Sequence, residues 1–451
     1  GATFTITTFR SLLAVEGDNQ TGQILSALPV SPAVRVVDAA DKPRAGVPVT
    51  FIPTGGGRVA AATVSTGADG VASPGTWTLG DIPGTQTLVV KLESAELTMT
   101  ATGTGTPIHY MPNQVVAGGY ATCALVSDGT AECWGEQPKV GDGGAANRAR
   151  PTATAGGVTF SSLAGSLTHF CGVARDQSIY CWGTNALVDS LATTPYTKTP
   201  TRTPGTLTWT AVAPGAAHNC ALATDQTVYC WGDNSFNQLG DRTNALRFTP
   251  APVYGSFRFA SVVSGTDHSC GLTADGSALC WGRNQFGQLG DGSIVSRSSP
   301  TAVGGALAFQ SLGAGETWTC GLTTAGKAYC WGNVTGTVQT TPQAYPNAPV
   351  FTSLSVAGGH ACALTADGTA YCWGDNRAGQ LGDSSTTNRA DPTPVAGSMK
   401  FKSVSAGYLH TCARTMDGSV ACWGLNRAGE LGDSTTTGRT TPRYLVLGVT
   451  P

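Results

Sequence analysis

Residues 351–383 read FTSLSVAGGHACALTADGTAYCWGDNRAGQLGD, and this stretch carries the pattern that decides the fold. Apolar and small residues dominate positions 360–365 and 370–374, and Asp367-Gly368 lies between these two runs. An Asp-Gly turn between two strand-like runs is a strong signal for a β-hairpin. The stretch therefore predicts two antiparallel strands joined by a tight turn.

Two further strands complete this unit. The segment 351–359 precedes the hairpin, and the Pro-containing segment 392–395 follows it after a Gly- and Asp-rich loop. Both segments are short and are bounded by turn residues, as expected for strands in a small sheet. The unit is therefore predicted to contain four strands.

The unit recurs seven times, and each copy places a cysteine ten residues before a second cysteine that begins the triplet Cys-Trp-Gly. The triplets follow one another at intervals of 48, 49, 50, 50, 42 and 50 residues. A period of that length, built from short strands, is typical of a β-propeller. The sequence predicts an all-β chain with a seven-bladed propeller over residues 114–451.

The cysteine pairs account for all 14 cysteines of the chain. The spacing places the two members of a pair opposite each other on the hairpin, which predicts one disulfide per blade. Zinc binding does not fit, because Cys-x9-Cys is not a zinc spacing, whereas reduced cysteines in a cytosolic protein remain an alternative. We expect an oxidising compartment and these bridges: Cys123–Cys133, Cys171–Cys181, Cys220–Cys230, Cys270–Cys280, Cys320–Cys330, Cys362–Cys372 and Cys412–Cys422.

The overall composition narrows the classes of partner. The chain has 26 basic and 28 acidic residues, and only 12% of its residues are charged. This balance gives no long-range field that would attract nucleic acid. The chain also contains no run of 18 apolar residues, so no membrane span is predicted. We expect a protein or glycan ligand, or further copies of the chain, as partners, and no cofactor.

The first hundred residues follow a different pattern. They contain no cysteine and show alternating runs at 33–38, 47–52 and 86–92, separated by turn residues. Short strands at this spacing favour a β-sandwich. The predicted boundaries are a sandwich domain at 12–104 and a linker at 105–113.

The sequence of this region resembles the bacterial immunoglobulin-like domains of the intimin and invasin type. The matching stretches are VRVVD at 34–38, AGVPVTF at 45–51, TGADGVA at 66–72 and WTLG at 77–80. The resemblance implies an immunoglobulin-like sandwich that acts as a spacer or presentation module on a cell surface. It brings no catalytic residue.

Residues 2–9 alternate like a strand but precede the point where such a domain starts. Residues 1–11 are therefore expected to form an N-terminal extension strand. It is either an extra edge strand or frayed terminus, or an assembly strand that pairs with a sheet edge in another subunit through Phe4 and Ile6.

The repeat itself resembles that of the regulator-of-chromosome-condensation family. The shared signature is Gly-x-x-His-x-Cys-x-Leu, Asp-Gly, Cys-Trp-Gly-x-Asn and Gly-Gln-Leu-Gly-Asp, as at 286–291 and 378–383. The resemblance implies a seven-bladed propeller, and the family includes the secreted bacterial β-lactamase inhibitor protein II. The cysteine pairs depart from the eukaryotic founder of the family and suit a secreted branch. The founder's nucleotide-exchange function does not carry over, because a basic extension is missing and the charge is near neutral.

Five repeats place a histidine two residues before the first cysteine, and the remaining two carry Ala121 and Trp318 there. A ring of imidazoles is able to bind a metal in principle. Repetition at one position of each blade favours a structural hydrogen bond instead, so no metal site is predicted. No Gly-x-Ser-x-Gly or His-Glu-x-x-His motif is found, and no catalytic residue or enzymatic activity is expected. The histidines are His169, His218, His268, His360 and His410.

The loops around the histidine position vary between repeats and carry the binding candidates. Loops from all blades of a propeller converge on one face, and aromatic residues are frequent anchors of protein interfaces. The predicted binding residues are Tyr120, Leu167, Asp267, Glu316, Trp318 and Tyr408.

These observations favour an extracellular or bacterial cell-surface binding protein of the adhesion type. The propeller would supply the interaction face, and the immunoglobulin-like domain would present it. Two alternatives stay open. One is a structural subunit of a filament or surface layer, assembled through the N-terminal strand or the propeller face. The other is a secreted inhibitor of an extracellular enzyme.

Overall fold

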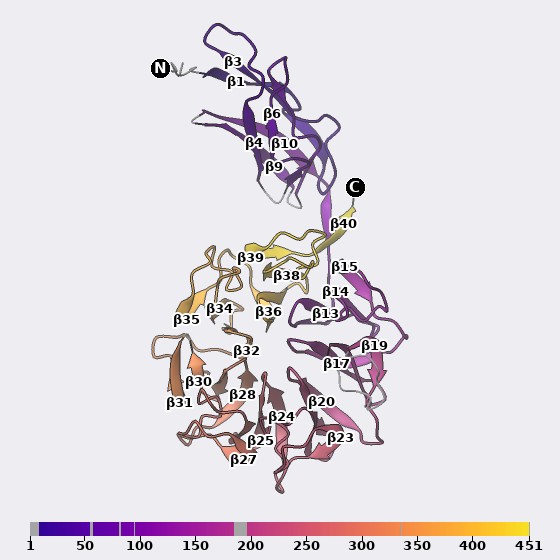
Figure 1. The fold of residues 1–451 in the computed structure, drawn as a ribbon, viewed down its shortest axis with the longest axis vertical. Coiled ribbons are helices and arrows are strands. Elements are labelled where there is room, and N and C mark those ends of the chain that lie inside the picture. Colours follow the sequence, from indigo (N-terminus) through magenta and orange to yellow (C-terminus); the bar gives the residue numbers. More distant parts are fainter. Residues whose placement is uncertain are drawn as a thin grey trace, which may run out of the picture. The chain divides into compact units, whose positions relative to one another are not determined.

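The computed structural model describes residues 9–54, 57–80, 83–93, 95–184, 196–334 and 336–450. Throughout these segments the regular elements are β-strands, which confirms the predicted all-β class (Figure 1). The chain divides into two compact units, one formed by Gly1–Tyr110 with Val446–Pro451 and the other by Met111–Leu445.

The N-terminal unit contains two main sheets with a shared apolar core. One sheet has the order β1 (Phe9–Glu16), β3 (Ala33–Asp38), β7 (Val71–Ala72). The other has the order β2 (Gln20–Gln23), β10 (Ala95–Thr104), β9 (Gly84–Leu92), β4 (Pro48–Pro53), β6 (Thr63–Ser65). A short pair joins β5 (Arg58–Val59) to β8 (Trp77–Thr78).

Alternate residues of these strands point into the core, as the period-2 pattern of the sequence requires. Val34 and Val36 of β3 are fully buried, and so are Leu88 and Val90 of β9. The two sheets supply one continuous hydrophobic cluster, in which Trp77 is the largest side chain. A two-sheet sandwich therefore forms where the sequence predicted one.

The start of this unit differs from the predicted boundary at residues 11 and 12. Strand β1 crosses that boundary and pairs antiparallel with β3. Its position at the edge of the sheet follows from the order β1-β3-β7. Phe4 and Ile6, the residues of the predicted assembly strand, lie outside the described residues.

The prediction of a linker at 105–113 is wrong. It contains β11 (Thr106–His109), which pairs antiparallel with β40 (Val446–Thr450). The last strand thus belongs with the N-terminal unit and not with the propeller. Local patterns missed this pair, because the partner of β11 lies at the opposite end of the chain and Gly105 and Pro107 read as turn residues.

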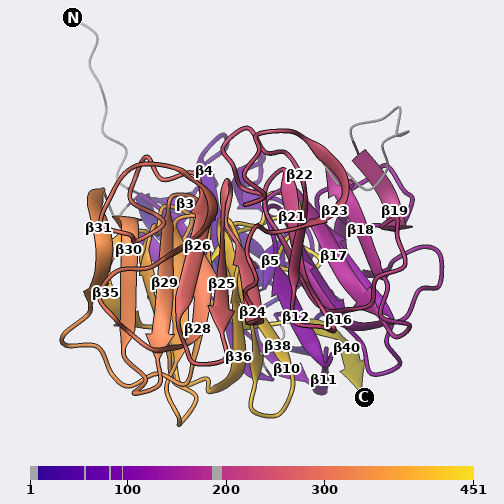
Figure 2. The same ribbon diagram turned by 90° about the horizontal axis from the view of Figure 1, so that it is seen from below.

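The second unit contains seven four-stranded antiparallel sheets among its described residues, and each sheet uses four consecutive strands. The sheets are arranged around a centre (Figure 1), and Figure 2 shows the same blades edge-on. We call them blades 1 to 7 in chain order. The predicted β-propeller is thereby confirmed.

The strands of blades 1 to 4 are β12 (Gln114–Ala117), β13 (Ala121–Leu125), β14 (Ala131–Gly135), β15 (Arg148–Ala153), β16 (Phe160–Gly165), β17 (His169–Ala174), β18 (Ile179–Thr184), β19 (Tyr196–Arg202), β20 (Trp209–Pro214), β21 (His218–Ala223), β22 (Val228–Gly232), β23 (Arg247–Pro252), β24 (Phe259–Ser264), β25 (His268–Thr273), β26 (Ala278–Gly282) and β27 (Arg297–Ala302). Those of blades 5 to 7 are β28 (Phe309–Ala314), β29 (Trp318–Thr323), β30 (Ala328–Val334), β31 (Thr337–Ala344), β32 (Ser353–Ala357), β33 (His360–Leu364), β34 (Ala370–Gly374), β35 (Arg389–Pro394), β36 (Phe401–Ala406), β37 (His410–Thr415), β38 (Val420–Gly424) and β39 (Arg439–Tyr444).

Each cysteine pair lies in direct register on the hairpin formed by the second and third strands of its blade. In blade 6, for example, Cys362 faces Cys372, and Gly368 adopts a positive φ of 80° in the turn. All seven predicted disulfides are present, with Cα–Cα distances of 4.0 or 4.1 Å. The predicted disulfide within the hairpin is confirmed in every blade.

Blade 1 closes the ring by packing against blade 7. The Ala117 N–H donates to Ser405 Oγ at 2.9 Å. No strand of blade 7 comes from the N-terminal side of the ring, because all of its strands are consecutive in the chain. The ring is therefore closed by contacts between sheets, and the strands that flank it, β11 and β40, pair with each other.

Candidate functional site

The predicted binding residues lie at one end of the propeller axis. In an antiparallel four-stranded blade, the turn after the first strand and the loop after the third strand lie at the same edge. We call these the first turn and the long loop of a blade. Their convergence makes one face of the propeller, and the hairpin turns make the opposite face.

The first turns surround a cavity of about 80 Å³ on the axis, lined by residues from all seven blades. Tyr408 and Leu167 belong to the lining, and Glu316 directly follows the lining residue Gly315. The cavity with its rim residues Tyr120, Leu167, Glu316 and Tyr408 is called the axial mouth below. The lining includes Gly118, Leu167, Ala216, Thr266, Gly315, Gly358 and Tyr408.

Backbone hydrogen bonds link the first turns of neighbouring blades. Thr266 N–H donates to the Gly315 carbonyl at 3.2 Å, and Glu316 N–H donates to the Gly358 carbonyl at 3.0 Å. A Cβ atom on Gly265 would lie only 2.4 Å from the Gly315 oxygen. Glycine at this position therefore permits the close approach that keeps the cavity narrow.

Tyr120 and Tyr408 come together across the seam between blades 1 and 7. Their ring centroids are 5.8 Å apart and the ring planes meet at 66°, an edge-to-face arrangement. The Lys139 ammonium lies 5.1 Å from the centroid of the Tyr120 ring and forms an ion pair with Glu136. Both tyrosines are half-buried, so the rim presents aromatic surface to solvent.

Charged groups surround Tyr408 on the other side. Asp375 and Arg377 form an ion pair at 2.8 Å, and the Arg377 side chain is 75% exposed. Glu316 is exposed, and its carboxylate forms no hydrogen bond or ion pair within the described part of the chain. Burial, together with the nearby carboxylate of Glu316 and the ring of Tyr120, raises the pKa of Tyr408 above its ordinary value. Tyr408 therefore stays neutral at physiological pH.

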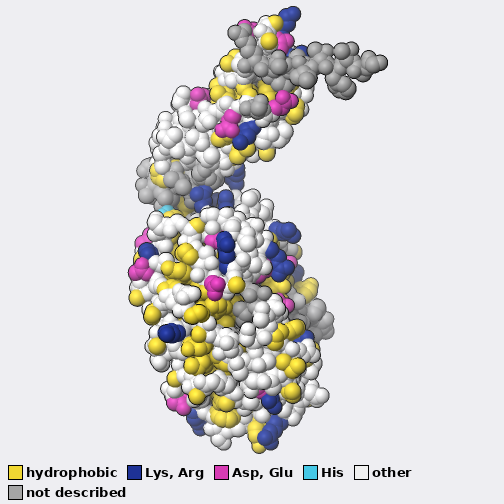
Figure 3. All heavy atoms as spheres, turned by 90° about the vertical axis from the view of Figure 1, so that its left-hand side faces the viewer, with side chains coloured by type: hydrophobic (Ala, Val, Ile, Leu, Met, Phe, Trp, Pro, Cys, Tyr) yellow, Lys and Arg dark blue, Asp and Glu magenta, His cyan; other side chains and the backbone are white. Residues whose placement is uncertain are grey.

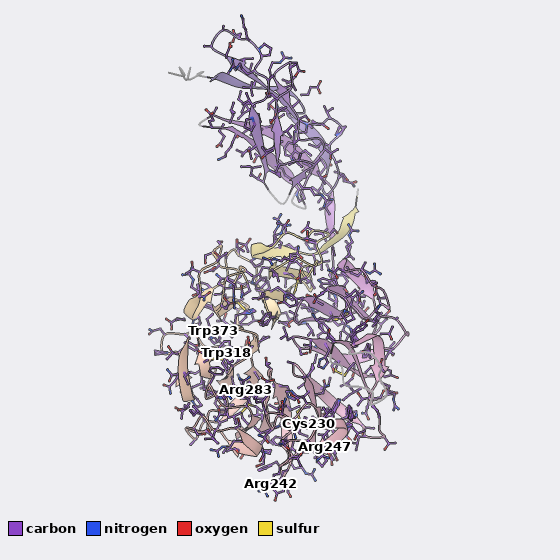
Figure 4. The ribbon with its side chains drawn as sticks, viewed as in Figure 1. Cys230, Arg242, Arg247, Arg283, Trp318 and Trp373 are labelled. Atoms are coloured by element: carbon purple, nitrogen blue, oxygen red, sulfur yellow. A yellow bond between two sulfur atoms is a disulfide. The ribbon has the colours of Figure 1, made fainter. Side chains whose placement is uncertain are left out.

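Asp267 is engaged by an intramolecular partner. Its carboxylate accepts from Arg283 at 3.0 Å. The Arg283 guanidinium lies 4.6 Å from the Phe236 ring centroid and 6.0 Å from that of Phe286. Figure 4 shows Arg283 and Trp318 on the inner side of the ring, whereas Arg242 lies at its outer rim.

The prediction of Trp318 as a binding residue is wrong, because its side chain is not exposed on the face. Its side chain is only 2% exposed, and its Nε1–H donates to the Gly358 carbonyl at 2.9 Å. It begins β29 at the position where five other blades carry a histidine, so it fills a core position. The sequence pattern placed it beside the loop, but burial removes it from the binding surface.

The five repeated histidines are fully buried and link adjacent blades. Thr319 Oγ1 donates to the Gln288 carbonyl at 2.8 Å, so it accepts from His268 Nε2–H, also at 2.8 Å. The other Nε2 contacts, all at 2.8 Å, join His169 to Asn219, His218 to Ser269, His360 to Thr411 and His410 to Thr122. The predicted structural hydrogen bond is confirmed.

Burial lowers the pKa of each of these histidines because the low-dielectric interior disfavours the charged imidazolium. The values fall to about 4 for His169, His268 and His360. They fall to about 3 for His218 and His410, where the charge of a neighbouring histidine adds to burial. All five are therefore neutral at physiological pH.

In the two blades that lack the histidine, the residue at the partner position of the next blade is also non-polar. Ala121 of blade 1 is followed in blade 2 by Phe170 at the partner position, and Trp318 of blade 5 is followed in blade 6 by Ala361. Where a histidine is absent, the partner is apolar. The signal for this pairing is present in the sequence one residue after each histidine position, but it emerges only when consecutive repeats are compared.

The side of the molecule in Figure 3 shows sparse and interspersed basic and acidic side chains. Among the residues whose placement is described, no group of three or more His, Cys, Asp or Glu side chains is arranged to hold a metal. The same residues include no helix that is long and apolar enough to cross a membrane.

Comparisons with known proteins agree with this geometry. A family model for the regulator of chromosome condensation (RCC1) repeat matches residues 225–272, 275–322 and 367–414. A second model of the same repeat matches residues 209–238, 259–288, 351–380 and 401–430. A search of curated protein sequences found no match.

Solved structures share the propeller fold. Human WBSCR16 is 20% identical with a TM-score of 0.60, and the match covers 66% of this chain and 85% of that one. Yeast RCC1 (Prp20), solved with Kap60, is 22% identical with a TM-score of 0.55, covering 65% and 78%. Another structure of Prp20p from Saccharomyces cerevisiae is 24% identical with a TM-score of 0.54, and the match covers 65% of this chain and 80% of that one. Beyond its N-terminal sandwich, the chain therefore carries an RCC1-type repeat propeller.

Proposed function

We propose that this protein is an extracellular, non-enzymatic binding protein whose propeller recognises another protein through the face that carries the axial mouth. The N-terminal sandwich, which resembles an immunoglobulin-like presentation domain, would display the propeller. In this proposal the protein serves adhesion or recognition at a cell surface.

The observation that carries the proposal is the half-buried pair Tyr120 and Tyr408 beside an unpaired carboxylate. Aromatic rings at a rigid rim supply contact area at a low entropic cost, and tyrosine is enriched at protein interfaces. The hydrogen-bonded first turns hold both rings in place. Such a preorganised surface loses little freedom when it binds.

Two further observations support the proposal. Seven intrachain disulfides and no free cysteine fit an oxidising environment such as the cell exterior. Among the structurally similar proteins, Prp20p has binding properties to Gsp1p and histones, and yeast RCC1 has been solved bound to Kap60. Proteins with this propeller fold therefore include protein-binding ones. A non-enzymatic role is supported by the buried histidines, which are all engaged between blades.

Biolayer interferometry tests the proposal. The immobilised protein is exposed to surface and secreted protein fractions, before and after protease treatment. We expect a protease-sensitive signal that the double variant Tyr120→Ala/Tyr408→Ala abolishes. Met416→Ala is the matched control, because Met416 is 57% exposed in a hairpin turn on the opposite face. A signal that survives protease would point to a glycan ligand, and equal loss in both variants would contradict the assignment of the face.

A second candidate, assembly into a filament or surface layer, is favoured by strand β1. It lies at the edge of its sheet, and its residues Leu13 and Val15 are 49% and 44% exposed. Exposed apolar edge strands are sites of strand addition. Negative-stain microscopy of Leu13→Lys/Val15→Lys against the unmodified chain checks this function, which requires ordered polymers that the variant lacks.

A further inference from the structure

We propose that the axial mouth binds the ammonium or guanidinium group of a lysine or arginine side chain that a partner protein presents on an exposed loop. This inference rests on the proposed function and specifies the chemistry of the partner. It follows from the kinds of polar group that surround the cavity, from their charges and from the size of the cavity.

Histidine acceptors lie directly behind the glycines that line the cavity. Because each imidazole of His218, His268 and His410 donates through Nε2, its Nδ1 carries a lone pair. No partner for these Nδ1 atoms is found among the described residues. The His218 and His268 rings pack against the cavity-lining glycines Gly215 and Gly265, where an added Cβ would lie 2.5 and 2.8 Å from Nδ1. The Nδ1 atoms themselves are shielded from solvent, but their lone pairs place partial negative charge behind the lining, which favours a cation in the cavity.

The charges of the first turns also favour a cationic ligand. Within residues 118–120, 165–168, 214–217, 264–267, 314–317, 357–359 and 406–409 there are two acidic residues and no lysine or arginine. Asp267 is neutralised by Arg283 at 3.0 Å. Glu316 is left as an exposed carboxylate beside the lining residue Gly315, with no ion pair in the parts of the chain described; the nearby Arg377 guanidinium pairs with Asp375 instead. A cation is therefore the complementary ligand.

Aromatic surface completes the site. Tyr408 lines the cavity, and Tyr120 contacts it edge-to-face at 5.8 Å. Cations bind over tyrosine faces, and the molecule already uses this contact for Lys139 above Tyr120. A guanidinium or ammonium group entering the mouth would meet aromatic surface and a carboxylate together.

The cavity has room for a side-chain head group. Its volume is about 80 Å³, and a neighbouring cavity of about 250 Å³, which shares the lining residues Pro214, Ser264 and Ala314, extends the space along the axis. The partner is therefore expected to insert one long side chain while its loop rests on the tyrosine rim.

Titration calorimetry with the full chain tests this assignment. The probe is the pentapeptide acetyl-Gly-Gly-Arg-Gly-Gly-amide, and its matched control carries citrulline, a neutral analogue of arginine. We expect the arginine peptide to bind at least about fivefold more tightly, the scale of one cation–π contact or exposed ion pair. The difference should shrink as salt rises from low to high concentration.

Three variants locate the interaction. Glu316→Gln should weaken binding of the arginine peptide by about fivefold, whereas Asp391→Asn, a removed charge on the outer strand β35, should leave it unchanged. Arg377→Ala should strengthen it, because a positive charge near Glu316 and Tyr408 is lost. Opposite signs for two exposed substitutions exclude misfolding as the cause.

Other outcomes overturn the inference. Equal affinity for the arginine and citrulline peptides, or no effect of Glu316→Gln, would remove charge recognition. Free agmatine binding more than about tenfold more tightly than the peptide would assign the mouth to a small free cation instead of a partner side chain. If the interferometry signal depends on Tyr120 and Tyr408 but the peptide does not bind, only this inference fails. If that signal is absent as well, the proposed function fails.

Discussion

His268 Nε2 lies 2.8 Å from Thr319 Oγ1 of the next blade, and the threonine hydroxyl donates in turn to the Gln288 carbonyl, which also accepts from Trp331 Nε1 at 2.9 Å. One buried imidazole thus connects the second strands of two blades to a long loop. The same connection recurs at His218, His360 and His410. At His169 the partner is Asn219, whose Nδ2 has no hydrogen-bond partner among the described residues. The connection explains why the histidine and a polar residue in the following blade occur together.

The first prediction concerns this connection. His268→Ala removes a buried hydrogen bond and leaves a cavity, so we expect a loss of about 2 kcal/mol in the free energy of unfolding. The double variant His268→Ala/Thr319→Phe recreates the Ala121 and Phe170 pair of blades 1 and 2 and should recover part of that loss. Chemical denaturation of both single variants and the double variant measures the coupling. Additive losses would show that the two positions act independently.

The second prediction is acid lability. In the unfolded chain each histidine has an ordinary pKa near 6.5, whereas in the fold the values are about 4 or about 3. The unfolded state therefore binds more protons, and the free energy of unfolding falls as pH drops from 6.5 towards 4. Carboxylates with a lowered pKa, such as Asp241 and Asp291, add to the loss only below their ordinary value of 3.8.

Denaturant titrations at several pH values between 8 and 4 check this window. The variant His268→Ala should show a shallower decline than the unmodified chain, because one titrating group has been removed. A free energy of unfolding that stays constant down to pH 4 would contradict the burial of neutral histidines.

The third prediction concerns the disulfides. Cys362→Ala/Cys372→Ala opens one short hairpin loop, and we expect a loss of about 2–3 kcal/mol on the chain-entropy model. Blade 6 should become the first region to exchange amide hydrogens. Hydrogen exchange by mass spectrometry measures this against blade 4, where Cys270–Cys280 remains intact. Uniform acceleration in both blades would indicate that the ring unfolds as one unit.

The fourth prediction concerns the pair of strands that flanks the ring. Removal of residues 446–451 deletes β40 and leaves β11 without its partner. The two ends of the propeller segment are then no longer held together, so the ring loses a loop-closing contact. We expect a lower melting temperature of the propeller by calorimetry. Removal of residues 450–451 alone should have a smaller effect, because most of the paired register survives.

The sequence predicted the blades well because their determinants are local. The Asp-Gly turns, the alternating runs and the ten-residue cysteine spacing all act within one hairpin, and the structure places each pair in register. The two-sheet core of the N-terminal unit was predicted for the same reason. Trp318 was misjudged because its neighbours in sequence belong to an exposed turn, while its neighbours in space belong to the core.

By itself the sequence determined the repeating unit, the number of cysteine pairs and the structural role of the repeated histidines, since each depends on residues within one unit or at one repeated position. Only the tertiary structure decided which residues meet across the seam, such as Tyr120 and Tyr408, and that β11 pairs with β40. Those contacts join the two ends of the ring, and their formation depends on how seven sheets close around an axis. No local pattern encodes that closure, because the partners become neighbours only after every blade between them has packed.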